Sequence, residues 1–79
     1  MNETATPLYH VCEKDATHKA WGIYSRRPRA RNFRLQTIVL DYEQAVQQAK
    51  GLAVQSTERR EWAVQGDIRA GHLPDYYSP

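Results

Sequence analysis

The sequence predicts an α+β fold, a small single-layer antiparallel sheet in β-β-β-α-β order packed on one amphipathic helix. Three observations lead to this prediction. The first part of the chain contains three short segments in which apolar and polar residues alternate, as they do in strands. Residues 41–55 carry apolar residues at helical spacing, and one more alternating segment follows them. A chain of 79 residues has room for one core, so we expect a single domain over residues 1–79.

Two strands are expected in the first 25 residues of the chain. Residues 8–13 and residues 19–25 both alternate, and the second segment is rich in aromatic and β-branched side chains. The polar residues 14–18 lie between them, which favours a β-hairpin. Gly22 within the second segment indicates a bulge or a close approach of another group to the backbone.

A third strand is expected over residues 32–40, leading directly into the helix. Pro28 disfavours a regular central strand between the second and third strands, because proline has no backbone N–H to donate to a sheet. We therefore expect a loop there. Alternation in the strands then defines the sheet face that the helix would cover. We expect this face to be built from Trp21, Ile23, Phe33, Leu35, Val39, Trp62 and Val64.

The helix is the clearest element in the sequence. Asp41 is a favourable N-cap, and Gln44 three residues later completes a capping-box pattern. The apolar side chains that follow fall on one stripe: Tyr42, Ala45, Val46, Ala49, Leu52 and Ala53. Gly51 costs about 1 kcal/mol relative to alanine inside a helix, so it marks either an early end or a place where the helix lies close to the sheet.

The rest of the chain is expected to add one strand and an irregular tail. Residues 61–65 alternate, whereas glycine and proline interrupt residues 66–79. We expect residues 1–7 and 74–79 to be flexible or loosely packed. No further element is left to cover the sheet face opposite the helix, so that face is either solvated or used for binding.

Positive charge is concentrated in one segment. The net charge of the chain is only +2, but residues 26–34 (RRPRARNFR) contain no acid and five arginines: Arg26, Arg27, Arg29, Arg31 and Arg34. Guanidinium groups match the oxygens of phosphate and carboxylate, and the nearby Tyr24 and Phe33 could stack on bases or pack against the arginine side chains. We therefore expect this segment to bind a polyanionic partner. Nucleic acid is the favoured partner, and an acidic protein is the other candidate. The alternative is that residues 26–34 form a solvated loop that keeps the protein soluble and binds no partner.

The layout of residues 20–49 resembles a known arrangement. An aromatic strand, a basic turn with Pro-Arg, an F-x-L strand and a capped, alanine-rich helix follow one another in WGIYSRRPRARNFRLQ and LDYEQAVQQA. This layout is similar to three-stranded-sheet-plus-helix DNA-binding folds, such as the plant AP2-type domain and the arm-binding domain of phage integrases. In those families the sheet enters the major groove. The resemblance implies that the five arginines of residues 26–34 contact DNA.

A protein partner is the alternative. Small β-β-α-β proteins of phages and mobile elements often dock on a host protein and inhibit it, and an open sheet face would suit that role. Tyr76 and Tyr77 are candidate interface residues. They could instead fold back over the open sheet face. An unpaired edge strand could also join two copies into a homodimer.

The sequence contains no motif for catalysis or for a cofactor. It has no glycine-rich phosphate loop, no G-x-S-x-G and no H-E-x-x-H, and a lone cysteine, Cys12, is typically a small buried hydrophobe. His10, Cys12, His18 and His72 lack the spacing of a zinc site. We expect a protein that is not an enzyme and has neither cofactor nor metal.

Compartment can also be inferred from composition. One cysteine excludes an intramolecular disulfide, and the first residues, MNETATP, lack the layout of a signal peptide. No apolar run approaches the roughly 18 residues that a membrane span needs. The expectation is a cytoplasmic binding or regulatory module with no membrane contact.

Overall fold

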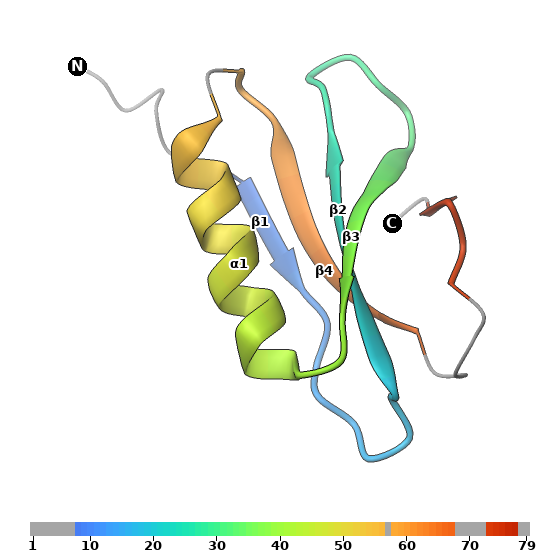
Figure 1. The fold of residues 1–79 in the computed structure, drawn as a ribbon. Coiled ribbons are helices and arrows are strands. Elements are labelled where there is room, and N and C mark those ends of the chain that lie inside the picture. The colour runs from blue at the N-terminus through green and yellow to red at the C-terminus, as the bar shows by residue number, and fades with distance from the viewer. Residues whose placement is uncertain (1–7, 57, 68–72, 78–79) are drawn as a thin grey trace.

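The computed structural model of the chain describes residues 8–56, 58–67 and 73–77. It has the predicted α+β architecture, with one helix lying across one face of a single curled sheet (Figure 1). The elements are β1 (Leu8–Val11), β2 (Ala20–Arg26), β3 (Phe33–Val39), α1 (Tyr42–Gln55), β4 (Glu61–Asp67) and β5 (Tyr76–Tyr77). The predicted order β-β-β-α-β is confirmed. β5 adds a short strand in the tail, where irregular chain was expected.

The strands lie in the order β1-β4-β2-β3-β5. β4 is inserted between β1 and β2, so the predicted hairpin of the first two strands is wrong. β1 pairs with β4 in parallel, whereas the other three pairs are antiparallel, so the sheet is mixed and the prediction of a wholly antiparallel sheet is wrong. The physical reason is that β4 has buried side chains on both faces, Ala63 and Val64 each being 1% exposed. Such a strand is stable in the interior of a sheet and not at its edge.

A β-bulge in β3 decides which side chains face the helix. Ile23 of β2 pairs with Thr37, but Tyr24 pairs with Leu35, which leaves Gln36 without a partner residue in β2. Side chains alternate strictly along a strand, so one extra residue moves those before it to the other face. Phe33 and Leu35 consequently lie on the face opposite the helix, and the prediction that they pack under the helix is wrong.

The main core lies between α1 and the sheet. Asp41 caps the helix as predicted, its carboxylate accepting a hydrogen bond from the backbone N–H of Gln44 at 3.0 Å. Small residues let the helix approach the strands closely. The buried core residues are Trp21, Ile23, Val39, Ala45, Ala49, Ala53, Trp62 and Val64, with Cys12, Tyr42, Val46 and Leu52 partly buried beside them.

A second, smaller core covers part of the opposite face. Tyr24, Phe33 and Ala63 are buried there, and Leu35 and Tyr77 pack against them. The segment 73–77 runs beside β3 and supplies Tyr77 (Figure 1). The sheet face opposite the helix is therefore partly covered by the tail of the chain.

Candidate nucleic-acid interface

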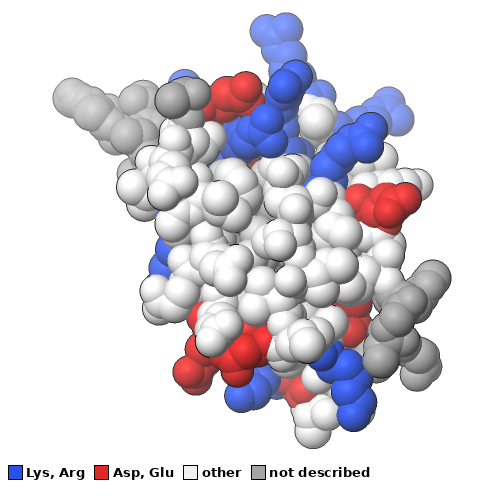
Figure 2. Space-filling model, in the orientation of Figure 1, with Lys and Arg blue, Asp and Glu red and all other residues white. Residues whose placement is uncertain are grey.

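One end of the molecule collects most of the arginines. The loop between β2 and β3 and the connection from α1 to β4 lie at this end (Figure 1), and Figure 2 shows basic side chains gathered there. We call this surface the arginine end. Its basic residues are Arg26, Arg27, Arg29, Arg31, Arg34, Arg59 and Arg60, and its acidic residues are Glu58 and Glu61. Together these nine side chains carry a net charge of +5, so the rest of the chain carries −3.

Arg26 has an internal role. Its Nε lies 2.6 Å from Oε1 of Glu61, and one of its terminal nitrogens donates to the carbonyl of Arg31 at 3.0 Å. The guanidinium carbon lies 4.6 Å from the centre of the Phe33 ring. Arg26 therefore fastens the β2–β3 loop to β4 and is not free to bind a ligand, although the sequence pattern grouped it with the other arginines.

Glu61 receives contacts from two sides. Its second oxygen, Oε2, lies 2.6 Å from Nε2 of His10 on β1. Partial burial raises the pKa of Glu61, but hydrogen bonds from His10 and Arg26 and the Arg26 charge outweigh it, so the pKa lies below its ordinary value of 4.5. The carboxylate is thus kept charged while it joins β1, β2 and β4.

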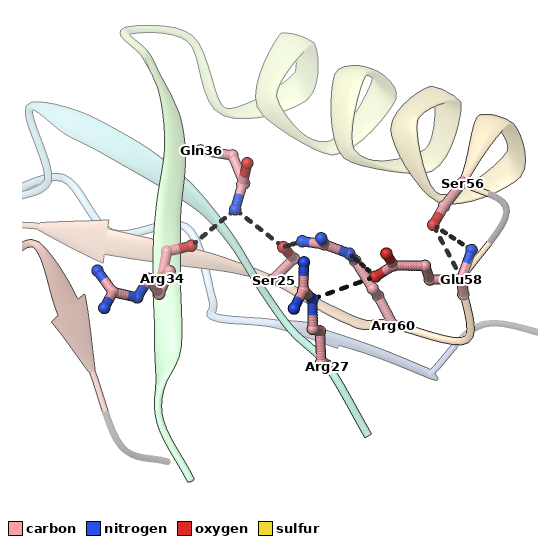
Figure 3. Close-up of polar contacts among 7 residues, drawn as sticks. All are labelled: Ser25, Arg27, Arg34, Gln36, Ser56, Glu58 and Arg60. Atoms are coloured by element: carbon pink, nitrogen blue, oxygen red, sulfur yellow. Dashed lines mark hydrogen bonds and ion pairs between the residues drawn. The ribbon is translucent and has the colours of Figure 1, made fainter. Parts of the chain in front are cut away.

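A second group of polar contacts lies beyond the C-terminal end of α1 (Figure 3). The Nε atoms of Arg27 and Arg60 lie 3.5 Å and 2.9 Å from Oε1 of Glu58. Arg60 also donates to the buried hydroxyl of Ser25 at 2.9 Å, and Gln36 donates to the same oxygen at 3.0 Å. This network holds the connection between α1 and β4 against β2 and β3.

Four arginines remain unneutralised. Arg29, Arg31, Arg34 and Arg59 are all exposed, and none of them forms an ion pair within the part of the chain that the structure describes. The first two lie on the β2–β3 loop, Arg34 lies on β3 and Arg59 precedes β4. These side chains supply the free cationic surface of the arginine end.

Two of the predicted contact residues are not accessible. Tyr24 and Phe33 are both 0% exposed, so neither can stack on a base. The Tyr24 hydroxyl donates to the carbonyl of Pro74 at 3.0 Å and to a carboxylate oxygen of Asp67 at 3.4 Å. Burial, followed by the charge of Asp67, raises the pKa of Tyr24 well above its ordinary value. Tyr24 and Phe33 are therefore structural residues.

The terminal tyrosines point to opposite faces of the sheet. Tyr77 stacks on Phe33, with ring centres 4.9 Å apart and planes at 11°, and meets the Tyr24 ring edge-on at 4.8 Å. Burial and the nearby charge of Glu61 raise the pKa of Tyr77 to about 12. Tyr76 pairs with Arg34 across β3 and β5 and is 54% exposed. Only Tyr76 is open to a ligand.

The residues considered for catalysis or metal binding have separate partners in the fold. His10 contacts Glu61, whereas His18 packs edge-on against Trp21. The Cys12 sulfur accepts a hydrogen bond from the backbone of Gly66, and burial raises the pKa of its thiol. His72 lies outside the described residues. Within the described ranges, no group of three or more His, Cys, Asp and Glu side chains could hold a metal ion.

Arg59 and Arg60 were missed as site residues by the sequence reasoning. They follow the helix and lie far along the chain from residues 26–34, but the sheet brings them to the same end, because Arg26 of β2 pairs with Glu61 at the start of β4. The available signal was a pair of consecutive arginines directly before the strand predicted over residues 61–65.

Comparison with protein-family models, with curated proteins and with solved structures found no match to this chain. The resemblance in layout to sheet-based DNA-binding folds stays a prediction from the sequence. Among the described residues no helix is long and apolar enough to cross a membrane.

Proposed function

We propose that this protein is a non-enzymatic binding module that holds nucleic acid through the phosphate groups at its arginine end. The observation that carries the proposal is the set of exposed, unneutralised arginines, Arg29, Arg31, Arg34 and Arg59, on one end of a molecule whose remaining surface is net negative. Arginine donates planar, paired hydrogen bonds to phosphate oxygens. A cytoplasmic location accompanies the proposal, because a chain with one cysteine needs no oxidising compartment.

The helix does not contribute to this binding. The N-terminus of α1 lies at the end of the molecule away from the arginine end (Figure 1). Asp41 and Glu43 lie in the cap and first turn of the helix there. Their charges favour the helix but repel phosphate. The ligand is therefore held by the loops and strands of the arginine end.

Docking of a host protein on the open sheet face receives less support. Tyr24, Phe33 and Ala63 are buried on that face, and Tyr77 covers Phe33. An acidic protein surface at the arginine end is the remaining competitor, and it enters the test below as an outcome.

The test compares two double variants that remove the same charge from opposite ends. In Arg29→Ala/Arg31→Ala the exposed loop loses two cations, and in Lys14→Ala/Lys19→Ala the loop between β1 and β2 loses two. Binding to labelled oligonucleotides is followed by fluorescence anisotropy over a series of salt concentrations. We expect the arginine variant to bind more weakly, with a salt dependence shallower by about 0.7 per lost contact for a single strand.

The lysine variant should bind almost as the unaltered protein does. Equal weakening in both variants would mean that binding follows net charge and not the arginine end. Failure of the unaltered protein to bind at low salt would contradict the proposal. Binding to poly-glutamate but not to oligonucleotides would contradict the proposal and indicate that the arginine end binds an acidic protein.

A further inference from the structure

The arginine end carries one exposed aromatic ring, and the fold of the tail places it there. Tyr76 lies directly opposite Arg34 in the β3–β5 pair. Directly paired residues of an antiparallel sheet have Cβ atoms about 4.5–5.5 Å apart and point to the same face. The side chains of Tyr76 and Arg34 therefore leave the sheet side by side on the same face.

Neither side chain has another partner within the described residues. Tyr76 is 54% exposed and takes part in none of the ring contacts that involve Tyr77, Tyr24 and Phe33. Arg34 makes no ion pair, and in Figure 3 its guanidinium extends away from the contacts around Ser25. An aromatic ring and a cation of this kind are both available to a ligand.

Tyr76 is also held in place. Its neighbour Tyr77 is stacked on Phe33, and the backbone N–H of Leu35 donates to the carbonyl of Asp75 at 2.9 Å. The Tyr24 hydroxyl binds the carbonyl of Pro74 at 3.0 Å. Three independent contacts thus fix the segment that carries Tyr76. The backbone that carries the Tyr76 ring therefore loses little freedom when a ligand binds, which favours binding.

We infer that Tyr76 and Arg34 form a base-stacking site for single-stranded nucleic acid, the ring taking a base and the guanidinium the adjacent phosphate. This inference rests on the proposed function and adds the class of ligand. A duplex keeps its bases stacked on one another and offers no free base face to Tyr76. A single strand offers both groups, and stacking tolerates any sequence because every base has a flat face.

The test separates stacking from phosphate binding. Three labelled ligands with equal numbers of phosphates are used: a single-stranded DNA, the same strand without bases, and a duplex. Stacking of one base predicts that the protein binds the base-bearing strand roughly fivefold or more tightly than the abasic strand. It also predicts tighter binding of that strand than of the duplex.

Two variants at one position assign the preference to the ring. Tyr76→Leu should abolish the preference for the base-bearing strand and leave affinity for the abasic strand unchanged. Tyr76→Phe keeps a ring and should keep the preference. Circular dichroism and thermal unfolding check that both variants fold, which we expect because the Tyr76 side chain is exposed.

The outcomes distinguish this inference from the proposed function. Equal binding of the base-bearing and abasic strands, or stronger binding of the duplex, would overturn the stacking site and leave phosphate binding in place. A preference that survives in Tyr76→Leu would also overturn it. Absence of binding to all three ligands would overturn the proposed function as well.

Discussion

At the residue scale, neighbouring arginines of one segment have different roles. Arg26 is paired with Glu61 and packed over Phe33, whereas Arg29 and Arg31, three and five residues further along the chain, are exposed and form no ion pair with a described residue. The difference arises because Arg26 still belongs to β2, where a strand directs its side chain onto the sheet, and the other two lie on the loop. Charge density in a sequence therefore does not say which cations are free.

Glu61 supplies the prediction at this scale. Replacement Glu61→Gln removes the charge that holds His10 and Arg26, and we expect a loss of about 1–2 kcal/mol in the free energy of unfolding at neutral pH. The pKa of Glu61 is depressed in the folded protein, so its contribution is present above pH 4.5 and is lost as the pH falls through the folded pKa. Denaturant unfolding of both proteins at several pH values measures this.

The matched control is Glu58→Gln, which likewise removes a carboxylate that has two basic partners, here Arg27 and Arg60. The Glu58 side chain is 46% exposed and that of Glu61 only 17%. An exposed pair contributes little, about 0–1 kcal/mol. A pH-independent difference between Glu61→Gln and the unaltered protein would contradict the assigned role of Glu61.

At the element scale, two glycines show how a common residue type serves different purposes. A Cβ on Gly22 of β2 would lie 2.5 Å from Cε1 of the buried Tyr24, whereas a Cβ on Gly51 of α1 would have no neighbour within 4 Å. Gly22 is thus a position where another group, the Tyr24 ring, lies close to the backbone, as the sequence indicated. Gly51 marks neither the end of α1, which continues to Gln55, nor a contact with the sheet.

Gly51→Ala should therefore stabilise the protein. Alanine loses less conformational freedom than glycine in a helix interior, and the site has space for a methyl group. We expect a gain of about 0.5–1 kcal/mol, or an increase of about 4–8 °C in Tm per kcal/mol for a domain of this size. Thermal unfolding followed by circular dichroism checks the sign.

Gly22→Ala is the contrasting change and should lower the Tm. The Tyr24 ring cannot move away easily, because its hydroxyl is bound to Pro74 and its faces are packed. A stabilised Gly22→Ala variant, or a destabilised Gly51→Ala variant, would show that the local packing described above is wrong.

At the scale of the whole molecule, the tail completes the sheet. β5 pairs with β3 far from it in sequence, and Tyr77 closes the second core over Phe33 and Tyr24. The same pairing sets Tyr76 beside Arg34 at the arginine end. One short segment therefore supports the fold through one tyrosine and offers the other to a ligand.

Tyr77→Ala tests the structural half of this statement. Removing a partly buried ring that stacks on another ring should cost about 2 kcal/mol of stability. Tyr76→Ala removes a ring of the same size from an exposed position, so its unfolding midpoint in denaturant should stay close to that of the unaltered protein. Equal stability of the two variants would mean that the tail does not pack as described.

The sequence by itself determined the elements of this protein. Helical spacing and the Asp41 cap identified α1, and alternation identified four of the strands and the α+β class. These features follow from local periodicity and local hydrogen bonds, so they can be read from neighbouring residues. The concentration of arginines in residues 26–34 was equally plain.

Only the tertiary structure decided how those elements meet. The insertion of β4 between β1 and β2, the bulge at Gln36 and the pairing of β5 with β3 depend on contacts between residues distant in the chain. These contacts bury Tyr24 and Phe33, occupy Arg26, and bring Tyr76 to Arg34. Alternation gives each strand two faces, but the order and register of the strands decide which face is buried, because burial depends on what the neighbouring strands present.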